Sequence, residues 1–406
     1  MTRVRVPIVA LMIVTLLGPA CASPDLVPIG AAGVTFAPDA DERALWTAAE
    51  KEEAALAART RRYDDPVLEE YLARLLAGVV PDTVRAAGPP LTLVVVRDPT
   101  LNAFAMPNGT IYVHTGLLSR LENEAQVATI LARELTHLVH RHALARERDR
   151  TRPPALPPAA RALVLGPTAS AIVGLGLPLA AVAAIDGYGR AREREADAGA
   201  VDGLVRAGYD PEAAPRAFER LRADASDRGA LETFLLGSPG FLSERLQTTR
   251  RLARDRRAAA AALRGAVGDS DVFELRMRPL VRENANEDVR AGRFTIAQRQ
   301  LDRVLAATPG DAMAHLYYGE LRRLMSQRAR DAAVARQSLA LAEASYDKAA
   351  ELDPSLAEPH RQLGFLYYQR RDYARASAAF TRYLELRPDA PDAERIKAYL
   401  TELARP

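Results

Sequence analysis

The sequence predicts a mainly helical protein with one small β-sheet, in which an α+β domain is followed by an α-helical solenoid. Apolar residues recur at helical spacing over residues 41–61, 66–76 and 122–148. Two runs rich in β-branched residues, 91–97 and 109–114, predict strands ahead of the longest of these helices. A sequence repeat near the C-terminus predicts the solenoid.

The composition is that of a globular protein with more than one domain. The chain has 406 residues, of which 48% are hydrophobic and 26% charged, so it is long enough for two or more hydrophobic cores. Its 55 basic and 52 acidic residues give a formal net charge of +3, and stretches such as 146–150 alternate in sign. Because the positive charge is small and dispersed, the sequence argues against nucleic acid binding.

The N-terminus has the pattern of a bacterial export signal. Arg3 and Arg5 precede an apolar run over residues 6–17, and Cys21 follows as the only cysteine of the chain. This arrangement resembles the lipidation site of bacterial lipoproteins, so we expect residues 1–21 to be a lipoprotein signal peptide. The alternative is an ordinary cleaved signal with an incidental cysteine. Because residue 22 is not Asp, lipoprotein sorting implies a periplasmic protein anchored to the outer membrane through Cys21.

Shifts in composition divide the remainder of the chain. Residues 22–40 are rich in Pro, Gly and Ala and are expected to form a tether. The predicted strands and the chemically distinctive helices fall within residues 41–250. We expect a helical connector over 251–285 and the repeat region over 286–400.

The repeat region has the spacing of tetratricopeptide repeats, each of which is a pair of helices. Pro354 precedes Pro388 by 34 residues, the length of one repeat. One complete copy is marked by Leu363, Gly364, Tyr367, Ala376, Phe380 and Pro388. An earlier copy with an insertion near 326–337 is marked by Gly319, Ala342, Tyr346, Ala349 and Pro354, and half of a third by Ala297, Leu301 and Pro309. Such a solenoid offers a concave surface for polypeptides, whereas a generic helical bundle is the alternative.

Residues 162–185 form an uncharged segment that is long enough, by length alone, to span a membrane. A single crossing would place Glu193 on the opposite side from His137, which is incompatible with one site that contains both. Gly166, Pro167 and further Gly and Pro residues also interrupt the run. We therefore expect two short helices, either buried or lying at a membrane surface.

Residues 133–137 read Arg-Glu-Leu-Thr-His, which is the H-E-x-x-H signature with arginine at its first position. In that signature, two histidines on one helix face bind Zn²⁺ and the glutamate activates the metal-bound water. Arginine stays protonated and has no lone pair for a metal, so Arg133 brings positive charge to the cation position. The spacing places Arg133, His137 and His140 on one helix face, away from the core stripe. That stripe consists of Val127, Leu131, Leu135 and Leu138.

A second charged motif follows at residues 193–197, Glu-Arg-Glu-Ala-Asp. Its Glu193 and Asp197 share a helix face at positions i and i+4. Alone, such a run indicates a solvent-exposed face, but its position after the signature helix favours a role in the same site.

Several segments together, in order and spacing, resemble a zinc metallopeptidase family with a zincin-like fold. It includes the CAAX prenyl proteases, the heat-shock membrane protease and the periplasmic β-barrel-assembly-enhancing protease. The matching segments are residues 102–109, 111–117, 122–124, 133–142, 193–197 and 207–211. The resemblance covers about residues 41–250, and the tetratricopeptide repeats make the periplasmic branch the most similar.

The resemblance implies a role for each matching residue. His137 and Glu193 would be zinc ligands, Glu134 the general base, and Asp197 a residue that supports the ligands. The strand formed by Ile111, Tyr112, Val113 and His114 would lie beside an extended substrate.

Two positions depart from the family pattern. Arg133 stands at the first-ligand position, and Ser238 stands in a Ser-Pro pair where periplasmic members carry His-Pro. Only His137 and Glu193 then remain, whereas catalytic zinc sites have three protein ligands. Without Zn²⁺ the carboxylates of the site would lack a counter-charge, so we predict that Arg133 contacts Glu193 or Glu134.

Three functions remain open from the sequence. The first is a non-catalytic or impaired peptidase homologue that binds envelope polypeptides, with outer-membrane assembly proteins among its partners, in a chaperone, assembly or quality-control role. The second is an active zinc metalloendopeptidase of the envelope, with the metal held by His137, His140 and Glu193. The third is a tetratricopeptide adapter on an inert domain. Zinc is the expected cofactor if the protein is active, and no cofactor is expected otherwise.

Overall fold

The computed structural model describes residues 26–151, 188–225, 239–262 and 270–404. The predicted signal peptide with Cys21, the uncharged segment 162–185 and Ser238 lie outside these ranges. Among the described helices, none combines the length and the apolar character that a membrane crossing requires.

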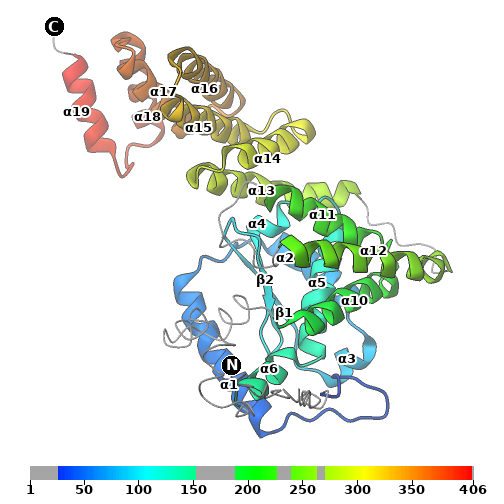
Figure 1. Ribbon diagram of the computed structural model, residues 1–406. Helices are drawn as coiled ribbons and strands as arrows, with labels where there is room; N and C mark the ends of the chain where they lie inside the picture. The colour runs from blue at the N-terminus through cyan, green and yellow to red at the C-terminus, as the bar shows by residue number, and fades with distance from the viewer. Residues whose placement is uncertain (1–25, 152–187, 226–238, 263–269, 405–406) are drawn as a thin grey trace, which may run out of the picture.

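The chain forms a mixed α/β body from which a helical arm extends (Figure 1). The body contains the sheet and the helices up to α12 (Pro239–Ala262), and the arm runs from α14 (Phe294–Ala307) to the C-terminus. Helix α13 (Ser270–Arg290) lies between them. The predicted fold class, a small sheet within a mainly helical chain, is confirmed. The expected division points at residues 250 and 285 fall within α12 and α13, so the boundaries themselves stay predictions.

The sheet has three strands in the order β1-β3-β2. Two of these strands were predicted from the sequence, β1 (Thr92–Val96) and β3 (Thr110–His114). They run parallel to each other. The third strand, β2 (Ala103–Ala105), pairs antiparallel with β3. Its three residues are too few to produce a detectable alternation of polar and apolar side chains, which is why the sequence pattern missed it.

This topology corrects the expectation that residues 111–114 lie beside an extended substrate. An added peptide strand needs an edge with unpaired backbone groups, and β3 is paired on both sides. The outer side of β1 is also engaged, because the amide of Tyr63 donates to the carbonyl of Val95 at 2.9 Å. Among these strands, the remaining edge is that of β2, whose three residues are buried.

Helix α5 (Glu124–Val139), which carries the signature, is buried on all its faces. Helix α10 (Arg190–Arg206) packs closely against it because small residues face α5 at the contact. A Cβ atom on Gly203 would approach the Cβ of Ala132 to 2.7 Å, and one on Gly199 would clash with the Thr136 side chain. The expectation of a chemical face directed away from the core was therefore wrong, because α10 covers that face.

The signature helix is also shorter than the predicted span of 122–148. It ends at Val139, and α6 (His142–Thr151) begins after a break at Arg141, whose φ is 56°. Helical periodicity continues across this break, so the sequence pattern does not reveal it. The other helices of the body are α1 (Ala40–Arg59), α2 (Pro66–Val79), α3 (Asp82–Ala87), α4 (Thr115–Leu118) and α11 (Ala213–Ala225).

The arm consists of antiparallel helix pairs, as the tetratricopeptide spacing predicts. Its remaining helices are α15 (Ala312–Arg328), α16 (Ala332–Leu352), α17 (Ala357–Gln369), α18 (Tyr373–Leu386) and α19 (Ala393–Leu403). In the pair α15–α16, Gly319 faces the ring of Tyr346. In the pair α17–α18, Gly364 faces the ring of Phe380. In each pair a missing side chain makes room for an aromatic ring, which is the physical basis of the repeat signature.

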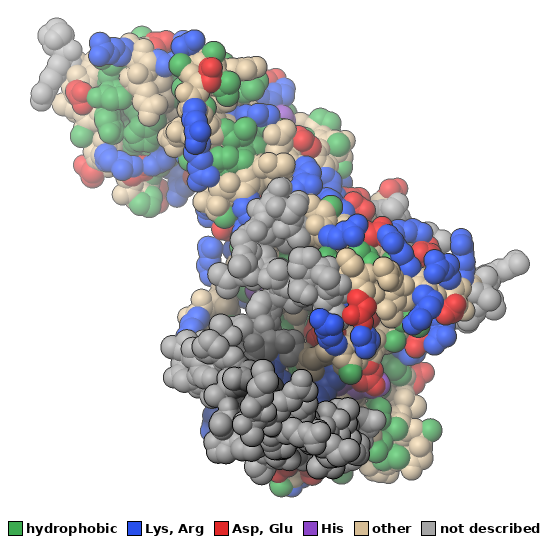
Figure 2. Space-filling model, in the orientation of Figure 1, with side chains coloured by type: hydrophobic (Ala, Val, Ile, Leu, Met, Phe, Trp, Pro, Cys, Tyr) green, Lys and Arg blue, Asp and Glu red, His purple; other side chains and the backbone are tan. Residues whose placement is uncertain are grey.

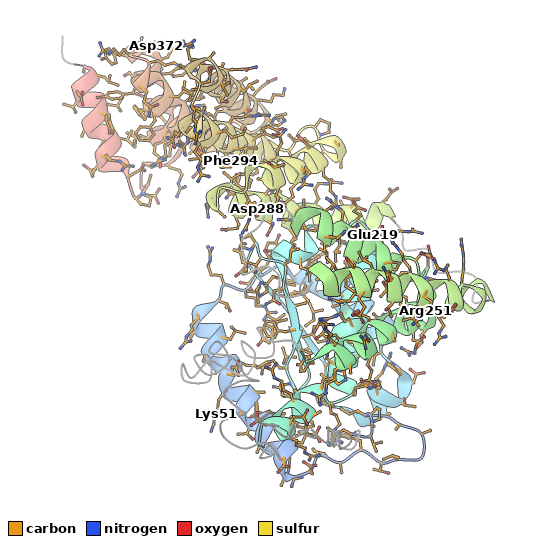
Figure 3. The ribbon with its side chains drawn as sticks, viewed as in Figure 1. Lys51, Glu219, Arg251, Asp288, Phe294 and Asp372 are labelled. Atoms are coloured by element: carbon orange, nitrogen blue, oxygen red, sulfur yellow. The ribbon has the colours of Figure 1, made fainter. Side chains whose placement is uncertain are left out.

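A buried polar network holds the arm against the body at Asp288 of α13 (Figure 3). The Arg120 guanidinium donates to Asp288 Oδ2 at 2.7 Å, and the two side chains are 2% and 0% exposed. Asn284 and Gln300 donate to the same carboxylate at 3.1 and 2.6 Å. Arg303 of α14 also donates to the carbonyl of Leu121, at 3.0 Å. The junction is therefore specified by directional bonds as well as by apolar packing.

We predict that Asp288→Ala destabilises the protein by about 3–5 kcal/mol, because it removes the carboxylate paired with a buried guanidinium. Urea unfolding measures this change. Glu351→Ala, which removes an exposed pair with Lys348, should cost less than about 1 kcal/mol. Equal effects of the two substitutions would show that the junction network is not structurally important.

Candidate functional site

The candidate site is assembled from three helices that pack side by side. Helix α5 begins at Glu124, where the Asn123 side chain accepts from the amide of Gln126 at 3.0 Å and caps the helix. Helices α10 and α12 contact each other, and α10 contacts α5. The site residues are Arg133, Glu134 and His137 from α5, Glu193 and Asp197 from α10, and Arg245 from α12; all six are buried. A set of buried charges of this size requires mutual compensation.

The guanidinium of Arg133 lies among three carboxylates. Its two terminal nitrogens donate to Glu134 and to Glu193. Its Nε lies 3.5 Å from Asp197 Oδ1. The contact predicted from the sequence is confirmed, and Arg133 bridges α5 and α10 at the position from which a signature histidine would project.

Asp197 is held by a second arginine that sequence reasoning missed. Arg245 donates to both carboxylate oxygens, with Nε to Oδ2 at 2.8 Å and Nη2 to Oδ1 at 2.7 Å. Both side chains are 1% exposed, and the guanidinium lies 4.3 Å from the ring centroid of Phe218. Arg245 belongs to a helix with many arginines, so no local signal separates it from the exposed ones.

His137 lies beside these charges but is not bonded to them. Its Nδ1 is 2.8 Å from Nδ1 of His142, and its ring stacks on Tyr188 at a centroid distance of 4.4 Å. Its Nε2 is 4.0 Å from Glu193 Oε1 and has no hydrogen-bond partner among the described residues. The amide of Tyr188 donates to that Glu193 oxygen at 3.2 Å.

The charges of the site set the protonation of its members. Burial lowers the pKa of His137 well below its usual value, and the positive charge of Arg133 lowers it further. Burial also raises the pKa of Glu134 to about 7, while Arg133 opposes this rise and the charge of Glu193 adds to it. The pKa of Glu193 is lowered despite its burial, because Arg133 and Arg245 stabilise its negative charge. Since two guanidinium groups face three carboxylates, Glu134 is the carboxyl that carries a proton most readily.

A zinc ion at the family position does not fit this arrangement. Glu193, which would be a ligand, accepts a hydrogen bond from Arg133, and the guanidinium cannot act as a ligand. His137 Nε2 is the one imidazole atom directed at Glu193 among the described residues. One imidazole and one carboxylate, beside a fixed positive charge, do not make a tight zinc site.

His140 does not join His137 and Glu193, as the alternative with a displaced metal requires. Its Nδ1 lies 2.6 Å from Glu195 Oε1 instead. The break at Arg141 and the C-terminal end of α5 turn His140 towards α10 at Glu195. The structure therefore separates His140 from the Arg133 site.

A small pocket opens between His137 and the edge of β2. Ala105, Met106 and Pro107 line one side, and His137, Leu138 and Tyr188 line another. The amide of Met106 points towards β3 and donates to the carbonyl of Thr110 at 2.7 Å. Because backbone groups alternate in direction along a strand, those of Ala103 and Ala105 point away from β3. An extended peptide that paired with this edge would run past His137.

The helix pair with Glu134, His137 and Glu193, placed beside a small sheet, defines a metallopeptidase-type domain. Residues 66–253 match the model of Peptidase family M48, and residues 329–401 match a model of the tetratricopeptide repeat. The chain therefore contains a peptidase family M48 domain followed by a tetratricopeptide region.

Curated relatives agree with this assignment. The chain is 25% identical over 284 residues to the beta-barrel assembly-enhancing protease of Escherichia coli, covering 61% of this chain and 57% of the relative. It is 25% identical over 264 residues to the protein of the same name from Yersinia pestis, covering 62% and 50%. It is 33% identical over 129 residues to the mitochondrial metalloendopeptidase OMA1 of Arabidopsis thaliana, covering 32% and 25%. The chain thus spans about half the length of the bacterial relatives it matches.

We predict that Arg133→Met destabilises the protein by about 3–5 kcal/mol at neutral pH, because it leaves buried carboxylates without their shared cation. Arg133→Lys should have a smaller effect, since it keeps the charge but loses the forked geometry. Urea unfolding measures both. Arg74→Met, which removes an exposed pair with Glu70, is the matched control and should cost less than about 1 kcal/mol.

A second prediction concerns pH. The pKa of Glu134 is raised from 4.5 to about 7 in the folded protein, so the folded state holds a proton that the unfolded chain releases. The stability due to this proton is fully present below about pH 4.5 and is lost as the pH rises towards about 7. Relative to Glu134→Gln, which cannot ionise, the native protein should lose stability over this interval in urea titrations. A constant difference across the interval would contradict the prediction, and Glu70→Gln on the exposed surface of α2 provides the control.

Proposed function

We propose that this protein is a metallopeptidase-family member whose zinc site has been replaced by an ion pair, and that it binds polypeptides without hydrolysing them at an appreciable rate. One observation carries the proposal. The Arg133 guanidinium occupies the centre of the site and bonds Glu134 and Glu193, the residues that the family resemblance assigns to general base and zinc ligand. Because Glu134 is engaged by Arg133, it cannot act as the free base of a metal-bound water.

The remaining features support binding. The edge of β2 and the adjoining pocket provide backbone groups and apolar contacts for an extended segment. The tetratricopeptide helix pairs provide a second surface of the kind that binds polypeptides. Figure 2 shows basic and acidic side chains interspersed over α11 and α12, which is unlike the one-sided basic surface of nucleic-acid-binding proteins.

The names of the bacterial relatives suggest where such binding takes place. They are called beta-barrel assembly-enhancing proteases, and the sequence around Cys21 has the pattern of a bacterial lipoprotein signal. We therefore assign this protein to the periplasm, held at the outer membrane by lipid on Cys21, with envelope polypeptides as clients and outer-membrane assembly proteins as partners. Its role would be in chaperoning or quality control.

The decisive experiment compares the native protein with Arg133→His. We predict that the native protein binds unfolded, fluorescently labelled casein without cleaving it. The variant should gain zinc-dependent hydrolysis, because it restores an imidazole four residues before His137 on the same helix face. Fluorescence anisotropy measures binding, and gel electrophoresis of the casein measures cleavage.

Two further variants make the result specific. Arg133→His combined with Glu134→Gln should bind zinc but remain inactive, because the general base is lost. Arg133→Lys should remain inactive with or without zinc. Zinc-dependent cleavage of casein by the native protein, abolished by Glu134→Gln, would instead establish the active-peptidase alternative.

A further inference from the structure

The break between α5 and α6 brings together two histidines that a continuous helix would separate. His140 and His142 are two residues apart, a spacing at which helical side chains point in nearly opposite directions. Arg141 between them has a φ of 56°, a conformation uncommon for residues other than glycine. The residue is held there by Glu42 of α1, which accepts from its Nε at 2.9 Å and from its Nη2. Such a conformation persists when its surroundings impose it, and it occurs often at functional sites.

Both histidines reach the same carboxylate on α10. His140 Nδ1 lies 2.6 Å from Glu195 Oε1, and His142 Nε2 lies 2.9 Å from Glu195 Oε2. The ligand atoms of the three residues all lie within 4.8 Å of one another. Among the residues that the structure describes, this is the group of histidines and carboxylates with metal-binding geometry.

We propose that His140, His142 and Glu195 form a binding site for a divalent transition metal, with zinc as the ion that fits best, separate from the site occupied by Arg133. Two imidazoles and one carboxylate are the ligand set of many zinc sites, in which water takes the fourth position. Zinc bonds of about 2.0–2.2 Å require a modest separation of the ligand atoms from their present contacts. The exposed Glu195 side chain permits this movement, since it is 46% exposed.

The surroundings of His142 complete the site. When Nε2 binds the metal, Nδ1 carries the proton, and this atom lies 2.8 Å from His137 Nδ1. A hydrogen bond from the distal nitrogen fixes the orientation of a metal-binding imidazole. His137 thereby acquires a supporting role in this site.

The location defines what the metal would do. His140 follows the last residue of α5, His142 is the first of α6, and Glu195 lies in the first turns of α10. An ion there would link the α5–α6 break to α10, two residues after Glu193 of the Arg133 ion pair. His140 is 30% and His142 is 3% exposed, so the ion would be reachable from solvent on the side of His140 and Glu195.

The test is a metal titration of the full chain after removal of metal with a chelator. We expect one equivalent of Zn²⁺ to bind, and Co²⁺ to give the visible absorption of a site with nitrogen and oxygen ligands. Glu195→Gln and His140→Ala should each weaken zinc binding by at least about tenfold, since even residues outside the ligand set cost 10–100-fold. Both residues are partly exposed, so the variants should keep the native circular dichroism.

The controls distinguish this site from other places for zinc. His315→Ala on α15, where the imidazole contacts the carbonyl of Pro309, should bind zinc like the native protein. Glu193→Gln should also retain binding. Zinc binding that survives Glu195→Gln but is lost in Glu193→Gln would overturn the proposal in favour of the Arg133 site, and the absence of stoichiometric binding in the native protein would overturn it outright. Because zinc here would obscure the metal content of Arg133→His, that measurement is made in the Glu195→Gln background.

Discussion

The structure depends on how three buried carboxylates are neutralised between α5 and α10. The two helices approach closely because Gly199 and Gly203 face α5, and this contact places the buried side chains of Glu193 and Asp197 next to that of Glu134. Carboxylates in such a place need a cation or a proton. Arg133 supplies the cation, and burial raises the pKa of Glu134, so this carboxyl takes up a proton more readily than an exposed one.

Under the proposed function, this arrangement explains how a peptidase scaffold would persist without its metal. In a zinc enzyme the ion both organises its ligands and carries out the chemistry. Arg133 organises the same carboxylates, and under the proposed function it does not replace the chemistry. Arg245 holds Asp197, the third of these carboxylates, through two hydrogen bonds. The β2 edge and its pocket do not include Arg133, Glu134 or Glu193, so an arginine in place of the signature histidine need not alter them. The imidazoles of His140 and His142 beside the break at Arg141 face Glu195 instead, where we propose a different ion.

Much of the fold could be predicted because its signals are local. Gly319 and Gly364 mark the repeats since each faces an aromatic ring one helix away, and that requirement produces a regular spacing. The contact of Arg133 with Glu134 and Glu193 was predictable because helix geometry and charge balance both require it. The strand proposed to pair with an extended substrate differs from the one predicted from the sequence, because the choice between β3 and the edge of β2 depends on strand order. A run of β-branched residues predicts a strand but not its position in the sheet.

The sequence by itself determined most of the helices, two of the three strands, the repeat and the chemical conflict at Arg133, because helix periodicity and the charge of a side chain are properties of short segments. Only the tertiary structure decided that α5 is buried on every face, that Arg245 belongs to the site, and that His140 joins His142 and Glu195 rather than Glu193. These outcomes depend on which helices pack against α5 and on the conformation of Arg141. Both are set by contacts between residues far apart in the chain, which local patterns do not record.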